Sequence, residues 1–400
     1  MIKFNLQLFA VQSSDTMPAE MKTYYDKELV DMADAELVHR QFCKKKSIPA
    51  NGGNKIEWRK FSNFEKALTP LTEGVTPTGH NLTVTPIVAE LEQYGDYTTV
   101  TDVLEMEAID DTILEITDKH ASNMGKTADT LTRNVMQTGT QVIYADGTTR
   151  YGLDASNKIT GTLVSKSATQ LKKMNAPKID GYYVGIIHPS VAYDLMQDSE
   201  WIDVQKYAEP ENRLKGELGK LHGVRFVETT EAKIFKGEDL CDASANLTVK
   251  TAVSASDTVT VNETLEANAL VGRYVLINDV KYKVSANTAS AITLVDAITG
   301  ATASVTASAG DAVYPGEGGK NGCAVYGTLF LGKDSTGTVD LENGGAEVIV
   351  KPVGSAGSSD PLDQRGSIGF KFSNADAILV DEYIVRLETG STYSDTDEAN

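Results

Sequence analysis

The chain has 400 residues, which at roughly 100–200 residues per domain predicts two or three domains with real cores. Its 37 Lys and Arg stand against 56 Asp and Glu, giving a net charge of −19, which argues against a dedicated nucleic-acid binder because such proteins neutralise phosphates. No apolar run approaches the ~18 residues of a membrane span, and three widely spaced cysteines argue against a disulfide framework or a cysteine-based zinc site.

The first 46 residues predict an arm without a secretory leader. The opening ten residues hold one early Lys and a short apolar stretch, with no small-residue cleavage site close behind. Residues 20–46 place apolar side chains at roughly helical steps. Lys44, Lys45 and Lys46 follow, and they are read either as a solvated charge cluster or as a basic arm facing DNA or an acidic neighbour.

Residues 55–61 and 82–91 predict two extended strands that flank a long tip over residues 69–79. Arms of a dozen residues reach about 40 Å, and an isolated two-stranded ribbon is marginally stable in water. This ribbon nevertheless carries large apolar side chains, so we expect a neighbouring copy of the chain to cover it. The predicted contact residues are Trp58, Phe61, Leu71, Val84 and Val88.

The clearest helix in the sequence is predicted over residues 107–139. Apolar side chains follow one stripe along it, carboxylates crowd its start, and Gly139 is a natural stop. Its length would be roughly 48 Å at 1.5 Å per residue. His120 lies on the stripe and is interpreted as a core histidine with a hydrogen-bond partner.

Residues 165–235 alternate between predicted helices and strands, and a strand at 181–187 leads into a helix begun by Pro189. Residues 237–320 are poor in charge and rich in Ala, Ser, Thr and Val, which predicts a small inserted all-β domain. Asn278-Asp279 indicates a tight hairpin turn within it. Further strands are expected over 323–331, 347–350, 367–372 and 377–387, followed by a disordered acidic tail over 391–400.

A search for catalytic motifs finds one near match. Residues 327–334 resemble a phosphate-binding loop, but Asp334 replaces the required hydroxyl residue and the intervening residues are strand formers. The five histidines form no close ligand pair. The sequence therefore predicts a non-enzyme with no catalytic, cofactor or metal site.

Several separate motifs, in the right order, resemble the major capsid proteins of tailed bacteriophages, and more narrowly the phage N-four-type family. The resemblance covers most of the chain except about 237–320. The motifs are Ile48–Gly53, Lys55–Phe61, Pro70–Pro77, Gln93–Tyr97, His188-Pro189, Gly216–Thr229, Asp360–Gly366 and Ala377–Val385.

This resemblance implies an α+β Hong Kong 97-type capsid fold with an inserted small all-β domain. The parts would be an N-terminal arm, an extended loop, a peripheral domain with a spine helix, and an axial domain. Their expected bounds are arm 1–48, extended loop 49–100, peripheral domain 101–164 and 335–390 with the spine at 107–139, axial domain 165–236 and 321–334, insert 237–320 and acidic tail 391–400.

The implied function is self-assembly through hexamers and pentamers into an icosahedral head that encloses double-stranded DNA. Portal, scaffold and decoration proteins would be the other partners, with no cofactor and no membrane, and the location would be the virion after assembly in the bacterial cytoplasm. The alternative is an exported surface-layer or adhesin-like protein, which the Ala/Ser/Thr-rich β segment suggests and the poor leader disfavours.

Overall fold

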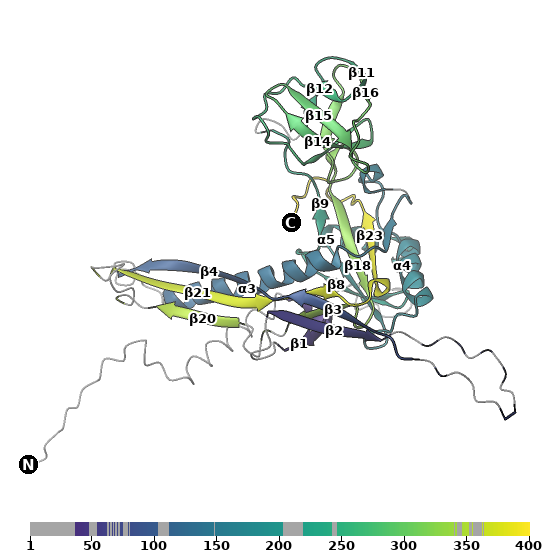
Figure 1. Cartoon of the computed structure of the whole chain (residues 1–400), viewed down its shortest axis with the longest axis vertical. Coiled ribbons are helices and arrows are strands. Elements are labelled where there is room, and N and C mark those ends of the chain that lie inside the picture. Colours follow the sequence, from purple (N-terminus) through teal and green to yellow (C-terminus); the bar gives the residue numbers. More distant parts are fainter. Residues whose placement is uncertain are drawn as a thin grey trace, which may run out of the picture. The chain divides into compact units, whose positions relative to one another are not determined.

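The computed structural model describes residues 37–47, 54–61, 81–102, 112–147, 149–202, 219–241, 246–339, 346–351 and 364–400, with isolated positions at 64–79, 341, 354 and 362. These residues form two compact units (Figure 1). Unit 1 comprises Met1–Val135 and Asp334–Leu379, and unit 2 comprises Met136–Lys333 and Val380–Asn400. Most of the helix expected over residues 20–46 lies outside the described residues, and its last part is instead a 3₁₀ turn at Arg40–Phe42 followed by a strand at Lys44–Lys46. Most of the ribbon tip, including Leu71, also lies outside the described residues.

Unit 1 contains the predicted ribbon. Strands β2 (Lys55–Phe61) and β3 (Val84–Glu90) pair antiparallel from Lys55↔Glu90 to Phe61↔Val84. A second small sheet has the order β1-β19-β22, in which β1 is parallel to β19 and β22 is antiparallel to it. Its strands are β1 (Lys44–Lys46), β19 (Thr336–Val339) and β22 (Ala377–Ile378), and the 3₁₀ turn η2 (Arg40–Phe42) precedes β1.

The core of unit 1 lies between a long helix and a three-stranded sheet. Helix α3 (Thr112–Met136) ends three residues before the expected stop, and residues 107–111 lie outside the described part. Its Ala121, Met124 and Ala128 are fully buried in one cluster with Phe370 and Phe372. The sheet has the antiparallel order β20-β21-β4, with β20 (Ala346–Lys351), β21 (Arg365–Asn374) and β4 (Glu92–Thr101).

His120 of α3 has the core role that the sequence predicts. It is 6% exposed, its Nε2 lies 3.0 Å from the Thr98 hydroxyl, and its ring meets the Phe370 ring edge-on at 5.6 Å. The hydrogen bond offsets the cost of burying a polar ring.

Unit 2 is built on a seven-stranded sheet in the order β5-β23-β18-β6-β8-β7, with β9 also paired to β18. Strand β18 is buried at every residue, as expected for a central strand. The strands are β5 (Val142–Tyr144), β6 (Tyr183–Ile187), β7 (Lys220–Leu221), β8 (Val224–Glu228), β9 (Ile234–Phe235), β18 (Val325–Leu331) and β23 (Ile384–Thr389). Helices α4 (Gly161–Lys173) and α5 (Pro189–Met196) and the 3₁₀ turns η3 (Arg150–Gly152), η4 (Lys320–Gly322) and η6 (Asp381–Tyr383) complete it.

This sheet joins segments that the expected domain bounds place apart. Residues 380–390 were expected beside 335–379, but β23 pairs with β18 over six residues and with β5 on its other edge. Strand β5 was likewise expected with the long helix, yet it belongs to the same sheet. The boundary therefore falls at the end of α3, because pairing with β18 holds both strands in unit 2.

The charge-poor segment forms a β module with its own hydrophobic core. A six-stranded sheet has the order β10-β17-β13-β14-β15-β12, and β11 and β16 form a separate pair. Asn278 and Asp279 have φ of 50° and 62°, which confirms the predicted turn. The strands are β10 (Leu247–Thr248), β11 (Val253–Ser256), β12 (Thr258–Thr260), β13 (Tyr274–Ile277), β14 (Val280–Asn287), β15 (Ala291–Asp296), β16 (Val305–Ala307) and β17 (Ala312–Pro315).

The prediction of a disordered tail over 391–400 is wrong, because the tail packs against unit 2. Thr392 donates its backbone N–H to the Asp194 carboxylate at 2.9 Å, and the Tyr326 hydroxyl donates to Asp397 at 2.7 Å. Further along, the Asn400 side chain accepts from the backbone N–H of Ile234 at 2.9 Å. These long-range hydrogen bonds hold a polar segment that has no apolar pattern of its own.

Candidate assembly interface

The β2–β3 ribbon has two different faces, because side chains alternate along each strand. Ile56 and Trp58 point inward and are 2% and 5% exposed. A Cβ placed on Gly337 of β19 would lie 2.7 Å from Cε2 of Trp58, so the indole lies directly against this glycine. The expectation that a neighbouring copy buries Trp58 is therefore corrected: its own chain already does so.

The opposite face of the ribbon carries the remaining predicted contact residues. Phe61, Val84 and Val88 are 57%, 41% and 52% exposed, and the register pairs Phe61 with Val84. Exposed apolar groups gathered on one face indicate a surface that a partner covers. Their contact with a neighbouring copy stays a prediction, and Leu71 is outside the described residues.

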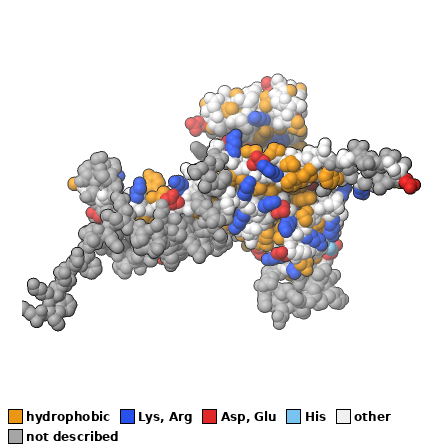
Figure 2. Space-filling model, turned by 60° about the horizontal axis from the view of Figure 1, so that its bottom comes forward, with side chains coloured by type: hydrophobic (Ala, Val, Ile, Leu, Met, Phe, Trp, Pro, Cys, Tyr) orange, Lys and Arg blue, Asp and Glu red, His pale blue; other side chains and the backbone are white. Residues whose placement is uncertain are grey.

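Beside this face lies a cleft of about 420 Å³, which we call the β1–β2 cleft. Three of its lining side chains are cationic, in a chain whose net charge is −19. Glu57 partly balances them, with its carboxylate 3.1 Å from Nε of Arg59. The lining residues are Lys44, Lys46, Glu57, Trp58, Arg59 and Phe61. On the face of the molecule that Figure 2 presents, Lys and Arg side chains are interspersed with hydrophobic side chains.

The segment before β1 is fixed by a buried carboxylate that the sequence reading missed. Asp129 of α3 is 0% exposed and accepts the backbone N–H groups of His39 and Arg40 at 2.7 and 3.1 Å. Its second oxygen lies 2.6 Å from Nδ1 of His39. The sequence offered one signal for this site: Asp129 lies on the same helix face as Ala121 and Ala128, and an Asp on a buried face needs partners.

Arg40 extends the same network into β19 and β21. Its guanidinium is 1% exposed and donates to the Asn374 side chain at 2.7 Å and to the carbonyl of Val339. Asn374 in turn donates to Asp376 at 2.7 Å. Burial, followed by the nearby Asp376 carboxylate, raises the pKa of the Cys43 thiol, so this cysteine stays protonated. The network ties the start of the described chain to the core of unit 1.

Unit 2 has a comparable ion cluster. Glu388 of β23 is 0% exposed and accepts two hydrogen bonds from Arg150, at 2.7 and 2.6 Å, and one from Arg386 at 2.7 Å. The Arg150 guanidinium lies 3.5 Å from the centroid of the Phe235 ring. Burial, together with Arg150, lowers the pKa of Lys281 in the β module.

The docked tail forms a further group of buried polar contacts in unit 2. Burial alone would raise the pKa of Asp397, but hydrogen bonds from Ser394, Tyr326 and Ser190 outweigh it and lower that pKa. His188 lies beside this carboxylate, and burial lowers the pKa of its imidazole. Its Nδ1 accepts the backbone N–H of Ser190 at 3.2 Å, which caps helix α5 and requires an unprotonated nitrogen.

The near match to a phosphate-binding loop lacks the loop geometry that would place backbone N–H groups around a phosphate. Gly327 and the following residues belong to β18, which is buried along its whole length.

Within the described ranges, no group of three or more His, Cys, Asp or Glu is arranged to hold a metal ion. No helix in the described part of the chain has the length and hydropathy to cross a membrane.

Comparison with known proteins gives one consistent result. Residues 96–277 match the model of a phage capsid protein family. The capsid of Ralstonia phage GP4 superposes with a TM-score of 0.57 at 11% identity, covering 89% of this chain and 88% of that one. The search of curated proteins found no match.

Two cyanophage capsids give similar superpositions. That of P-SCSP1u has a TM-score of 0.52 at 13% identity and covers 88% of this chain and 87% of its own. That of Pam1 has a TM-score of 0.52 at 12% identity and covers 86% of each chain. At these identities the likeness is one of fold, and it extends over nearly the full length of both partners.

Proposed function

We propose that this chain, whose fold is that of Hong Kong 97-type phage capsid proteins, is the major subunit of an icosahedral phage head, and that the outer face of its β2–β3 ribbon joins neighbouring copies into the hexamers and pentamers of that head. The observation that carries the proposal is the exposed apolar row of Phe61, Val84 and Val88. Burying such a row removes apolar surface from water, which stabilises the interface by roughly 25 cal/mol per Å² of apolar area buried.

Contacts of this kind are heterologous, because a ribbon on one copy meets a different surface on the next. Heterologous contacts close into a ring when the rotation that relates neighbouring copies is a whole fraction of a full turn. Obligate interfaces bury roughly 2,000–5,000 Å², an area that one ribbon face would supply only in part. We therefore expect other surfaces of unit 1 to contribute.

The head would enclose double-stranded DNA without gripping it. A net charge of −19 repels phosphate and keeps the packaged genome free to leave. Assembly in the host cytoplasm, together with portal, scaffold and decoration proteins, belongs to the same proposal. The absence of catalysis is proposed on the same ground, since a shell subunit needs no chemical step.

The β module is proposed to be an insertion that projects outward from the head, because an inward module would take up genome volume. Limited proteolysis of intact particles tests this placement. Cleavage within residues 240–315 supports an outward module, and full protection of that segment contradicts it.

The ribbon is tested by removing residues 62–80 and by replacing Phe61 and Val84 with Ser. We expect both variants to remain folded and to lose intact shells in electron micrographs. The matched control replaces Val271 and Val280 of the β module, which are 47% and 48% exposed, with Ser. Normal shells from the ribbon variants would contradict the proposed role of the ribbon.

A further inference from the structure

The β1–β2 cleft is bordered by two strands with open edges. Within the described residues, β1 is the outermost strand of the β1-β19-β22 sheet, and β2 pairs only with β3. One carbonyl of β2, that of Glu57, accepts a hydrogen bond from the Lys46 ammonium, which an incoming strand would have to replace. Open edges expose backbone N–H and C=O groups and are natural sites for the addition of another strand. Duplex DNA cannot supply the alternating peptide donors and acceptors that such an edge requires, so a polypeptide is the better fit.

The side chains of the cleft specify the chemistry of that polypeptide. Lys44 and Lys46 are two positions apart, so both point to the same side of β1, and Arg59 adds a third cation. Phe61 adds an exposed aromatic ring at the same cleft. An extended segment with carboxylates two positions apart, alternating with apolar side chains, matches this arrangement.

Four segments wholly outside the described residues have two carboxylates at this spacing: 26–28, 34–36, 105–107 and 209–211. Segment 26–28 carries Lys27 between its carboxylates, and this cation offsets their attraction to the lysines of the cleft. Segment 209–211 carries Pro210 between its carboxylates, which removes a backbone donor. Segment 34–36 alternates only with alanine. In residues 104–107, Glu105 and Glu107 alternate with Leu104 and Met106, and Asp110 and Asp111 follow with no intervening Lys or Arg.

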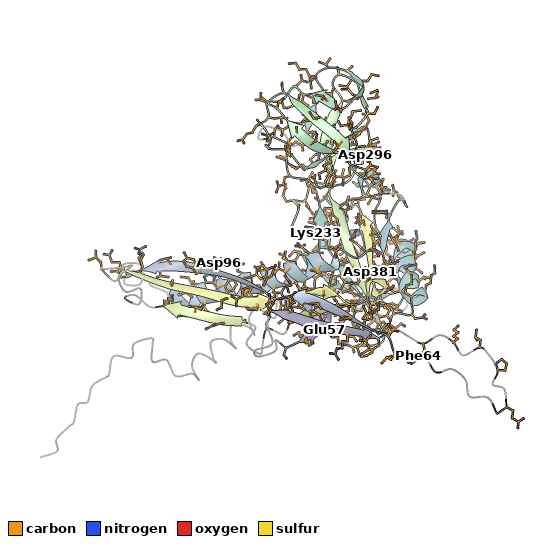
Figure 3. The ribbon with its side chains drawn as sticks, viewed as in Figure 1. Glu57, Phe64, Asp96, Lys233, Asp296 and Asp381 are labelled. Atoms are coloured by element: carbon orange, nitrogen blue, oxygen red, sulfur yellow. The ribbon has the colours of Figure 1, made fainter. Side chains whose placement is uncertain are left out.

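A segment so close in sequence to β4 cannot reach the cleft of its own chain. The backbone N–H of Leu91 binds Asn54 at the start of the ribbon, and β4 then runs for ten residues, about 33 Å at 3.3 Å per residue. Figure 3 shows Glu57 on the ribbon and Asp96 well along β4 toward the far end of unit 1. Asp102, the last described residue before this segment, directly follows β4, so we infer that the occupant comes from another copy.

We propose that the β1–β2 cleft binds residues 104–107 of a neighbouring copy as an added strand, with Glu105 and Glu107 facing Lys44 and Lys46. The ribbon meets the start of β4 and Asp102 follows its end, so a contact between the cleft and the segment after Asp102 is head to tail and can propagate around a ring. This inference rests on the proposed function and names a second interface beside the apolar ribbon face.

Charge exchange tests the contact in the full chain. We expect Lys44→Glu with Lys46→Glu to reduce the yield of shells at least tenfold, and Glu105→Lys with Glu107→Lys to do the same. Combining all four substitutions restores opposite charges and should recover at least half of the wild-type yield. The control is Lys172→Glu with Lys173→Glu, two exposed lysines of α4 that should leave the yield unchanged.

Circular dichroism and melting curves establish that each variant is folded before its shells are counted. Failure of the four-fold variant to recover, when both double variants lose shells, would overturn the inference. Normal shells from the double variants would also overturn it, while leaving the proposed function intact. Normal shells with reduced DNA content would assign Lys44 and Lys46 to DNA instead and would equally overturn the peptide contact.

A photo-crosslink identifies the bound segment directly. With p-benzoylphenylalanine in place of Phe61, mixed isotope-labelled and unlabelled copies should give crosslinks between copies to a peptide that contains residues 103–111. Crosslinks confined to one copy, or to another segment, would contradict the proposal.

Discussion

Replacing Gly337 with Ala should weaken the packing of β2 in the ribbon against β19. The added Cβ would lie 2.7, 2.9 and 3.1 Å from Cε2, Nε1 and Cζ2 of Trp58. Carbon atoms pack best at about 3.5–4.0 Å, so the indole must move by roughly 0.8 Å or more. The backbone of Gly337 has no positive φ, so the whole effect comes from this contact.

Overpacking a filled site costs about 1–3 kcal/mol. For a unit of this size each kcal/mol lowers the melting temperature by about 2–4 °C, so we expect Gly337→Ala to melt roughly 2–12 °C below the wild type. Urea unfolding followed by tryptophan fluorescence and by circular dichroism measures the change. Gly79→Ala is the control, because a Cβ at Gly79 would meet no atom within 4 Å.

A second substitution shows whether the indole is the cause. Trp58→Leu removes the atoms that Gly337→Ala would contact, so the cost of the double variant should fall below the sum of the two single costs by about 0.5–3 kcal/mol. A Gly337→Ala protein with wild-type stability, or strictly additive costs, would show that Trp58 does not rest on this glycine.

Three further predictions concern the buried polar groups. Asp129→Ala should cost about 3–5 kcal/mol in urea unfolding, because it strands a buried histidine and two backbone N–H groups, whereas the exposed Asp118→Ala on the same helix should cost under ~0.5 kcal/mol. Glu388→Gln should cost a comparable ~3–5 kcal/mol, because two arginines lose their shared counter-ion, and equal melting temperatures would contradict this. The pKa of His188 is lowered in the folded state, so the unfolded state binds more protons, and the stability that this histidine contributes should be complete above pH 6.5 and decline as the pH falls below it. Melting curves between pH 5 and 8 measure the slope, which His188→Gln should reduce.

Local sequence determined the elements whose geometry depends on neighbouring residues. The alternation over 55–61 fixed strand β2 to the residue, since one face had to be apolar. Asn278-Asp279 fixed a hairpin turn because these residues tolerate positive φ. The helical stripe identified α3, and Pro189 identified the start of α5.

Pairings between distant residues were decided only by the tertiary structure. Arg40 and Asn374 are 334 positions apart, and Tyr326 and Asp397 are 71 apart. No periodicity links such residues, so neither the network around Asp129 nor the docking of the tail was foreseen. Trp58 is the clearest case: its large apolar side chain correctly predicted burial, but only the approach of Gly337 shows that its own chain provides the cover. Periodicity specifies which face of an element avoids water, whereas the surface that covers that face is set by long-range packing.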